Sequence, residues 1–196
     1  MTAVLKTNPA PTTDADLVRA AAGGCRESFA ALARAYQVPL LRFLRQRLGA
    51  TEDAEDVFQE TMLAVHRNLD RYDDRWAFST WVFTIARRQA VSFQRRPRLR
   101  LAGGDGSLDH VAARASDPAG TVARDDDAQN LWTVARRALS ADQFDIVWMH
   151  YAEQLSLDDV AKVVDKSSLS VRVALHRARQ KLKRELARMD EKEGRL

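Results

Sequence analysis

The sequence predicts an all-α protein of two small helical domains joined by a flexible linker, the C-terminal one a helix-turn-helix. Three observations lead to this fold class. Apolar residues recur every three or four positions along both halves of the chain, as they do on one face of a helix. Strand-like alternation of apolar and polar residues is absent from the sequence. Residues 98–127 interrupt the helical repeat with Gly, Asp and Pro in a pattern typical of a linker.

Composition narrows the class of protein. The chain has 196 residues, and 45% of them are hydrophobic, which is enough for packed cores. Its 31 basic and 27 acidic residues give a net charge of +4, and these charges are segregated along the chain. The single cysteine, Cys25, excludes an internal disulfide and a multi-cysteine metal site and fits a reducing compartment. The sequence has neither a signal-peptide pattern nor an apolar run that spans a bilayer, so we expect a cytoplasmic protein without membrane insertion.

The first domain is expected over residues 14–97, after a flexible leader at 1–13 that contains Pro9 and Pro11. A short helix over 14–22 should stop at the Gly23-Gly24 pair. A longer apolar-faced helix over 26–48 should end at Gly49. Pro39 lies inside it and is expected to kink or split it, because proline lacks a backbone donor and clashes with the preceding turn.

An acidic helix over 51–69 comes next. Glu52, Asp56 and Glu60 follow one another at four-residue spacing, where like charges repel by ~0.2–0.5 kcal/mol per pair. The helix dipole, with an N-cap such as Thr51, offsets this repulsion for the first acids but not for Glu60. Two interpretations remain open: a solvated acidic face, or a docking face for a basic partner.

An aromatic bend and a basic helix close this domain. The bend carries Tyr72, Trp76, Phe78 and Trp81, and the helix over 79–96 gathers arginines in its far half. Aromatic rings beside cations suit single-stranded nucleic acid, since each base stacked on a ring contributes ~1–3 kcal/mol. The alternative is that Phe78 and Trp81 plug the helix junction.

The second domain is expected over residues 128–196. Ser156 and Asp159 form a capping-box pattern at the start of a short helix, and a turn over 165–168 leads to the last helix. That helix should turn Val171, Leu175, Ala178 and Leu182 inward. Its opposite face holds Leu169, Arg172, Val173, His176, Arg177 and Gln180, which would meet base edges of duplex DNA. His176 has no second ligand that would make it a metal site.

Several motifs together resemble the extracytoplasmic-function (ECF) class of bacterial RNA polymerase sigma factors. They are Asp53-Ala-Glu-Asp-Val-Phe-Gln-Glu60, Phe78-x-x-Trp81-x-x-x-Ile85-Ala-Arg87, Leu139-Ser-Ala-Asp-Gln143, Leu155-Ser156 and Leu175-His-Arg-Ala-Arg179. The resemblance implies a specificity subunit that binds the clamp coiled coil of core RNA polymerase and promoter DNA, often under the control of an anti-sigma factor. It also implies a linker that threads into the polymerase cleft, and no cofactor, metal or catalytic residue.

The resemblance assigns residues to three surfaces. Core-polymerase binding is expected at Glu52, Asp53, Asp56, Gln59 and Glu60. The minus-ten element is expected to meet Tyr72, Trp76, Phe78, Trp81, Thr84, Arg87, Arg88 and Arg95. The minus-thirty-five element is expected to meet Ser167, Ser170, Arg172, Val173, His176, Arg177, Gln180 and Lys181. The turn departs from the family pattern, with Asp165 where Gly is usual.

Two other classes compete with this interpretation. A helix-turn-helix repressor acting without polymerase would not need the acidic helix. An enzyme acting on nucleic acid would need grouped carboxylates with metal-binding geometry, or a nucleophile with a base. The acids of this sequence follow helix-face and linker patterns instead.

Overall fold

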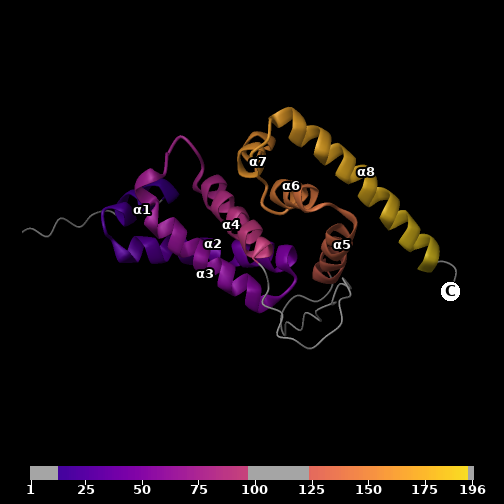
Figure 1. Ribbon diagram of the computed structural model, residues 1–196, viewed down its shortest axis with the longest axis horizontal. Coiled ribbons are helices and arrows are strands. Elements are labelled where there is room, and N and C mark those ends of the chain that lie inside the picture. Colours follow the sequence, from indigo (N-terminus) through magenta and orange to yellow (C-terminus); the bar gives the residue numbers. More distant parts are fainter. Residues whose placement is uncertain (1–12, 97–123, 194–196) are drawn as a thin grey trace, which may run out of the picture.

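The computed structural model describes residues 13–96 and 124–193, and all regular structure in these two ranges is helical (Figure 1). The elements are α1 (Asp14–Ala22), α2 (Arg26–Leu48), α3 (Thr51–Arg67), a 3₁₀ turn η1 (Leu69–Arg71), α4 (Phe78–Arg95), α5 (Arg124–Ala138), α6 (Ala141–Tyr151), α7 (Leu157–Val164) and α8 (Ser168–Glu193). The expected leader up to residue 12 and the expected linker from 98 to 123 lie outside the described residues.

Local signals fix the first two helices. Thr13, the last residue of the expected leader, caps α1 by accepting a hydrogen bond from the Asp16 backbone N–H at 3.2 Å. Gly49 ends α2 with φ at +86°, a conformation that glycine adopts without steric cost. We expected Pro39 to kink or split α2; the helix is not split, because it continues through Pro39. Leu32 before the proline and Leu40 after it are both buried, and their packing outweighs the lost backbone hydrogen bond.

Helix α3 has the predicted apolar face, with Ala54, Val57 and Val65 buried. Its N-cap is Ala50 rather than the expected Thr51, which is the first helical residue. The helix ends at Arg67, and the chain then turns through η1 into the aromatic bend. Helix α4 therefore starts at Phe78, one residue earlier than predicted.

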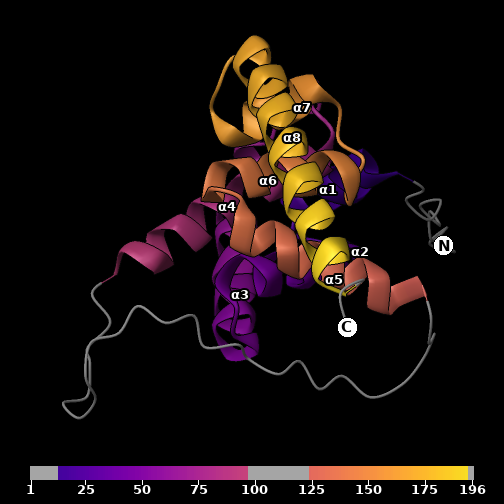
Figure 2. The ribbon, with the colours of Figure 1, turned by 90° about the vertical axis from the view of Figure 1, so that its right-hand side faces the viewer.

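The second unit contains α5 to α8. Helix α5 begins at Arg124, inside the stretch expected to be linker; the acidic composition that marked this stretch also suits a helix N-terminus. A capping box of Ser140 and Gln143 opens α6. Helix α8 lies along α5, α6 and α7, as Figure 2 shows. It continues to Glu193 and so includes part of the charged tail.

The two units pack against each other in one continuous hydrophobic core. Helix α4 lies against α7, and α2 contacts both α5 and α6 (Figure 1). The Phe43 ring on α2 lies 6.4 Å from that of Trp148 on α6, centroid to centroid. A Cβ at Gly49 would lie 2.5 Å from a guanidinium nitrogen of Arg136, so the Arg136 side chain of α5 reaches the end of α2. Among the described helices, none combines the length and apolar character needed to span a membrane.

Candidate nucleic-acid interface

The outer face of α8 presents the predicted duplex-reading residues on one exposed surface. Val171, Leu175 and Ala178 are buried against the other helices of the unit, as the helical period predicted. The opposite side is exposed and holds Arg172, Val173, His176, Arg177, Gln180 and Lys181. At the start of the helix the Ser167 hydroxyl accepts a hydrogen bond from the Ser170 backbone N–H at 3.2 Å. All eight residues predicted for duplex DNA therefore lie on α8 or at its N-terminus.

The turn between α7 and α8 has a tight geometry. Ser156 caps α7 as predicted, accepting a hydrogen bond from the Asp159 backbone N–H at 3.1 Å. The Ser156 hydroxyl also donates to the Asp159 carboxylate. Asp165 ends the helix with φ at +56°, which explains why glycine is favoured there. The Lys166 backbone N–H then donates to the Ala161 carbonyl at 2.9 Å. A surface hollow of about 490 Å³ next to this turn has both acidic and basic side chains in its lining.

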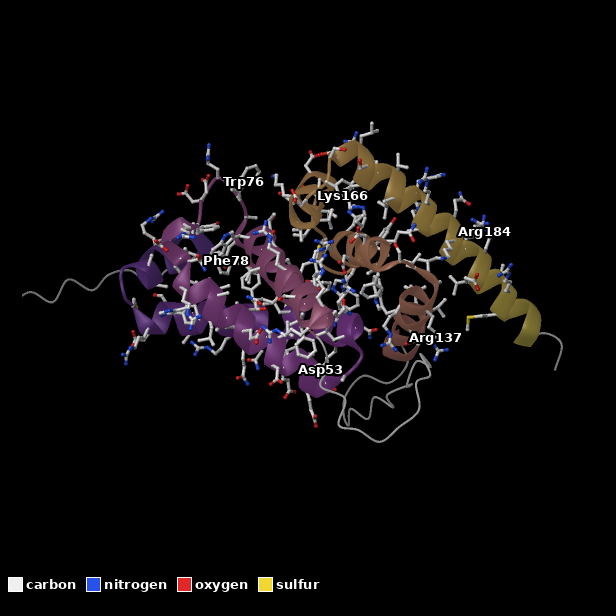
Figure 3. The ribbon with its side chains drawn as sticks, in the orientation of Figure 1. Asp53, Trp76, Phe78, Arg137, Lys166 and Arg184 are labelled. Carbon is white, nitrogen blue, oxygen red and sulfur yellow. The ribbon has the colours of Figure 1, made fainter. Side chains whose placement is uncertain are left out.

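The acidic face of α3 is exposed at Glu52, Asp56 and Gln59 and half-buried at Asp53 and Glu60. Arg96, at the end of α4, pairs with both oxygens of Glu60 at 3.0 and 3.3 Å. Within the described ranges Glu52 and Asp56 have no ion-pair partner. Asp53 lies in the first turn of α3, at the lower edge of the molecule in Figure 3. The repulsion along this face is thus offset at Glu60 but not at Glu52 and Asp56.

The aromatic residues of the bend divide into buried and exposed members. Phe78 is only 3% exposed, and its ring contacts those of Tyr36, Tyr72 and Trp81 at centroid distances of 5.1 to 5.6 Å. This packing agrees with the junction-plug interpretation of Phe78. Trp76 is 41% exposed, in the loop before α4 that faces α7 (Figure 3). The ammonium nitrogen of Lys162 on α7 lies 3.4 Å from the centroid of its ring.

The arginines of α4 differ in exposure as well. Arg88 and Arg95 are exposed, whereas the side chain of Arg87 is only 14% exposed. Its Nη2 donates to Asp142 at 2.8 Å and its Nε to Asp145 at 3.0 Å. Thr84 is half-buried, and its hydroxyl donates to the Thr80 carbonyl at 2.7 Å. The structure therefore brings Arg87 to α6 rather than to the exposed arginines.

A buried acid organises the boundary between the units. The Asp145 side chain is 0% exposed, and Arg47 Nε of α2 lies 2.8 Å from its Oδ1. Burial raises the pKa of Asp145, while Arg47 and Arg87 act in the opposite direction. Asp142 lies nearer the surface and also pairs with Lys166 at 2.9 Å. Lys166 first, and then Arg87, hold the pKa of Asp142 below its usual range.

The sequence prediction missed Arg47, Asp142 and Asp145 as interacting residues. One signal was available, because Asp145 is the only charged residue within the apolar run Phe144-Asp-Ile-Val-Trp-Met149. A carboxylate at such a position needs a cationic partner when the run is buried. In the described part of the chain, no group of three or more His, Cys, Asp or Glu residues could hold a metal ion.

Family models match both units. The model for Sigma-70 region 2 matches residues 32–100, which include α3, the aromatic bend and α4. The model for Sigma-70 region 4 matches residues 135–182, which include the helix-turn-helix. The two matches thus fall on the two surfaces that carry the predicted polymerase-binding and DNA-binding residues.

Individual proteins are similar over most of their length. The ECF RNA polymerase sigma factor SigF of Caulobacter vibrioides is 31% identical over 149 residues, which cover 76% of this chain and 79% of SigF. CnrH, solved in complex with the cytosolic domain of CnrY, has a TM-score of 0.66 at 22% identity over 89% of this chain and 97% of CnrH. The sigma factor RpoE of Bartonella quintana, solved with the anti-sigma factor NepR, has a TM-score of 0.62 at 21% identity over 82% of this chain and 98% of RpoE. These two structures have the same helical fold.

Proposed function

Because this chain belongs to the ECF RNA polymerase sigma factors, we propose which of its surfaces bind polymerase and which read the promoter. As an alternative sigma factor, the protein directs core RNA polymerase to specific promoters. Its contribution is binding and recognition, since members of this family are not enzymes. Residues 14–97 form the polymerase-binding and minus-ten domain, residues 128–196 the minus-thirty-five domain, and residues 98–127 the connection between them.

Core polymerase binds the acidic face of α3, through Glu52, Asp53, Asp56, Gln59 and Glu60. The observation that carries this assignment is the row of like charges on an exposed face, where Glu52 and Asp56 have no ion pair within the described ranges. A basic partner surface would relieve the repulsion and fix the register of docking. Arg96 already compensates Glu60, so Glu52 and Asp56 gain most from docking.

The experiment for this assignment is charge reversal. Glu52→Lys/Asp56→Lys should weaken binding to core polymerase about tenfold or more, because attraction becomes repulsion at two positions. The matched control is Asp70→Lys/Asp74→Lys, which makes the same change of net charge at exposed positions of the same unit that lie after α3, outside its acidic face. Equal affinity of both double variants for core polymerase, with unchanged helix content, would contradict the assignment.

The promoter is read by two different surfaces. Single-stranded minus-ten DNA contacts the bend and α4, where Trp76, Arg88 and Arg95 are the most accessible of the predicted residues. Duplex minus-thirty-five DNA contacts the outer face of α8. Arg172 and Arg177 lie on that face and can bridge guanine acceptors in the major groove. Lys181 and Lys183, farther along the helix, are phosphate contacts.

A promoter library transcribed at two salt concentrations separates these roles. Arg172→Ala or Arg177→Ala should cost ~1–3 kcal/mol and relax base preference at one or two positions. Lys181→Ala or Lys183→Ala should weaken all promoters alike and reduce the salt slope by roughly one unit. A uniform loss for the arginine variants would move base reading to Val173, His176 and Gln180.

We also propose that an anti-sigma factor regulates this protein. The support is the likeness to the sigma factor RpoE, which was solved with the anti-sigma factor NepR. Purification of the tagged chain with its bound proteins, followed by transcription with and without each of them, tests this partner. A chain that purifies alone and is fully active in cells under all conditions would contradict it.

A further inference from the structure

The outer face of α8 carries two apolar side chains, Leu169 and Val173, among polar and cationic residues. Leu169 is 71% exposed and is the most exposed large apolar residue in the part of the chain that the structure describes; Val173 is 42% exposed. Resting on the proposed function, we propose that this apolar pair contacts the 5-methyl groups of thymines in the minus-thirty-five duplex. The pair thus gives the protein a preference for A·T pairs at one or two defined positions of that element.

Helix α8 has two apolar stripes on opposite faces. Val171 and Leu175 point into the core, where they are 0% and 6% exposed. Leu169 and Val173 are four residues apart, so they are neighbours on the outer face, and both side chains are exposed to solvent. Exposed apolar side chains that lie together often mark a binding surface. The outer stripe is therefore available to a ligand.

The residues around the pair indicate the class of this ligand. Residues 168–184 contain no acidic residue, and the helical period places the exposed Arg172 and Arg177 on the two sides of the pair. Cations in this arrangement attract a polyanion. The pair also lies near the N-terminus of the second helix of the helix-turn-helix, the part of such a helix that contacts base edges. In the major groove the apolar group of a base is the thymine methyl, so duplex DNA fits both the charge and the apolar pair.

Local hydrogen bonds fix the turn that presents Leu169. The Ser167 hydroxyl accepts from the Ser170 backbone N–H at 3.2 Å, and the two hydroxyls lie 2.8 Å apart. The Ser168 hydroxyl donates to Asp158 on α7 at 2.6 Å. These hydroxyls are engaged within the protein, so Leu169 is the side chain of this turn that we expect to enter the groove. A side chain on a fixed backbone loses less conformational freedom on binding, which favours a specific contact.

The spacing of the pair limits how much sequence it can read. Four residues of helix rise by ~6 Å, and stacked base pairs are ~3.4 Å apart. Leu169 and Val173 can therefore reach methyl groups on about two neighbouring base pairs. Arg172 lies beside them and can bridge guanine acceptors in the same stretch of groove. The minus-thirty-five element should thus have an A·T pair next to a G·C pair.

Removal of single methyl groups from the promoter tests the proposal without any change to the protein. Holoenzyme assembled from core polymerase and the full chain first selects a promoter duplex from a library. Each thymine of its minus-thirty-five element is then replaced in turn by uracil, which pairs in the same way but lacks the methyl group. At one or two positions, uracil should weaken holoenzyme binding about fourfold, the usual effect of one buried methyl group.

Protein variants assign the effect to the apolar pair. In Leu169→Ala/Val173→Ala, the same uracil replacements should have no effect, because the methyl contact is already lost. Each single variant should lose the response at one position, and circular dichroism checks that helix content is unchanged. The matched control is Val38→Ala, which shortens an apolar side chain at a 64% exposed position of α2 and should keep the wild-type response to uracil.

Several results would overturn the proposal while the proposed function stands. They are a selected element without an A·T pair, no response of the wild-type holoenzyme to any uracil, or the same response in the double variant. A defect of the double variant that is equal on thymine and uracil promoters would also refute it and indicate a protein partner for the pair. If the holoenzyme selects no duplex from the library, the proposed function itself fails.

Discussion

Replacement of Asp145 by Ala should destabilise the protein by ~3–5 kcal/mol, because it leaves two arginines without their buried counter-ion. The magnitude follows from the geometry: Asp145 is 0% exposed, Arg47 lies 2.8 Å away and is 7% exposed, and Arg87 lies 3.0 Å away and is 14% exposed. Separation of the two units sets an upper limit on this loss of stability, because both arginines return to water when the units undock. The loss therefore cannot exceed the free energy of docking.

Urea unfolding followed by two probes measures this effect. Circular dichroism reports all helices. Tryptophan fluorescence of a Trp76→Phe/Trp81→Phe/Trp132→Phe background reports Trp148 on α6, next to the interface. A double-mutant cycle with Arg47→Ala isolates the pair, and residues in direct contact should show a coupling energy of about 0.5–3 kcal/mol. If the two units of the variant undock before their helices unfold, the fluorescence and circular dichroism transitions will occur at different urea concentrations.

Asp142→Ala is the matched control, because Asp142 is on the same helix and shares Arg87 but is 46% exposed. This replacement should lower the free energy of unfolding by no more than about 1 kcal/mol, which is the usual contribution of an exposed ion pair. The reasoning is refuted if Asp145→Ala costs as little as Asp142→Ala, or if the cycle gives no coupling.

Three further predictions concern the bend, the turn and acid pH. Phe78→Ala should lower the free energy of unfolding in urea by ~3–5 kcal/mol, because it leaves a cavity at a buried site. Trp76→Ala should lower it by under about 1 kcal/mol and mainly slow open-complex formation in a stopped-flow assay. Equal stability losses for the two variants would contradict this division. Asp165→Gly should raise the free energy of unfolding by roughly 0.5–1 kcal/mol, because it relieves a positive φ; a lower melting temperature would count against it. Lys166 lowers the pKa of Asp142 in the folded protein, so this interaction stabilises the fold above the unfolded-state pKa of Asp142, and the contribution is lost as pH falls through the lower folded pKa. Lys166→Ala should reduce this acid dependence in urea unfolding at several pH values, and an unchanged dependence would contradict the prediction.

Local features of the fold were predictable from the sequence. Helix α1 has the predicted bounds, because Thr13 and the Gly23-Gly24 pair are strong local signals. The inward residues of α8 follow from the helical period, which also places Arg172 and Arg177 outside. The predicted all-α fold class is confirmed by the structure.

Long-range packing was not predictable in the same way. Periodicity identifies an apolar face but not its partner, so nothing local indicated that α4 would lie against α7. Arg87 pairs with Asp145 across 58 positions of sequence, and its place among other arginines favoured a DNA contact. Pro39 does not split α2, because the buried residues around it stabilise the helix more than one proline destabilises it.

Run-off transcription with core RNA polymerase over a promoter library tests the central claim most directly. The account predicts transcripts only when polymerase and this protein are both present, from promoters that share two sequence elements at a fixed spacing. It also predicts that Glu52→Lys/Asp56→Lys needs about ten times more protein, or still more, to give the same amount of these transcripts as the wild-type chain. Specific binding of duplex DNA without polymerase, together with no transcription in its presence, would contradict the account and favour a helix-turn-helix repressor.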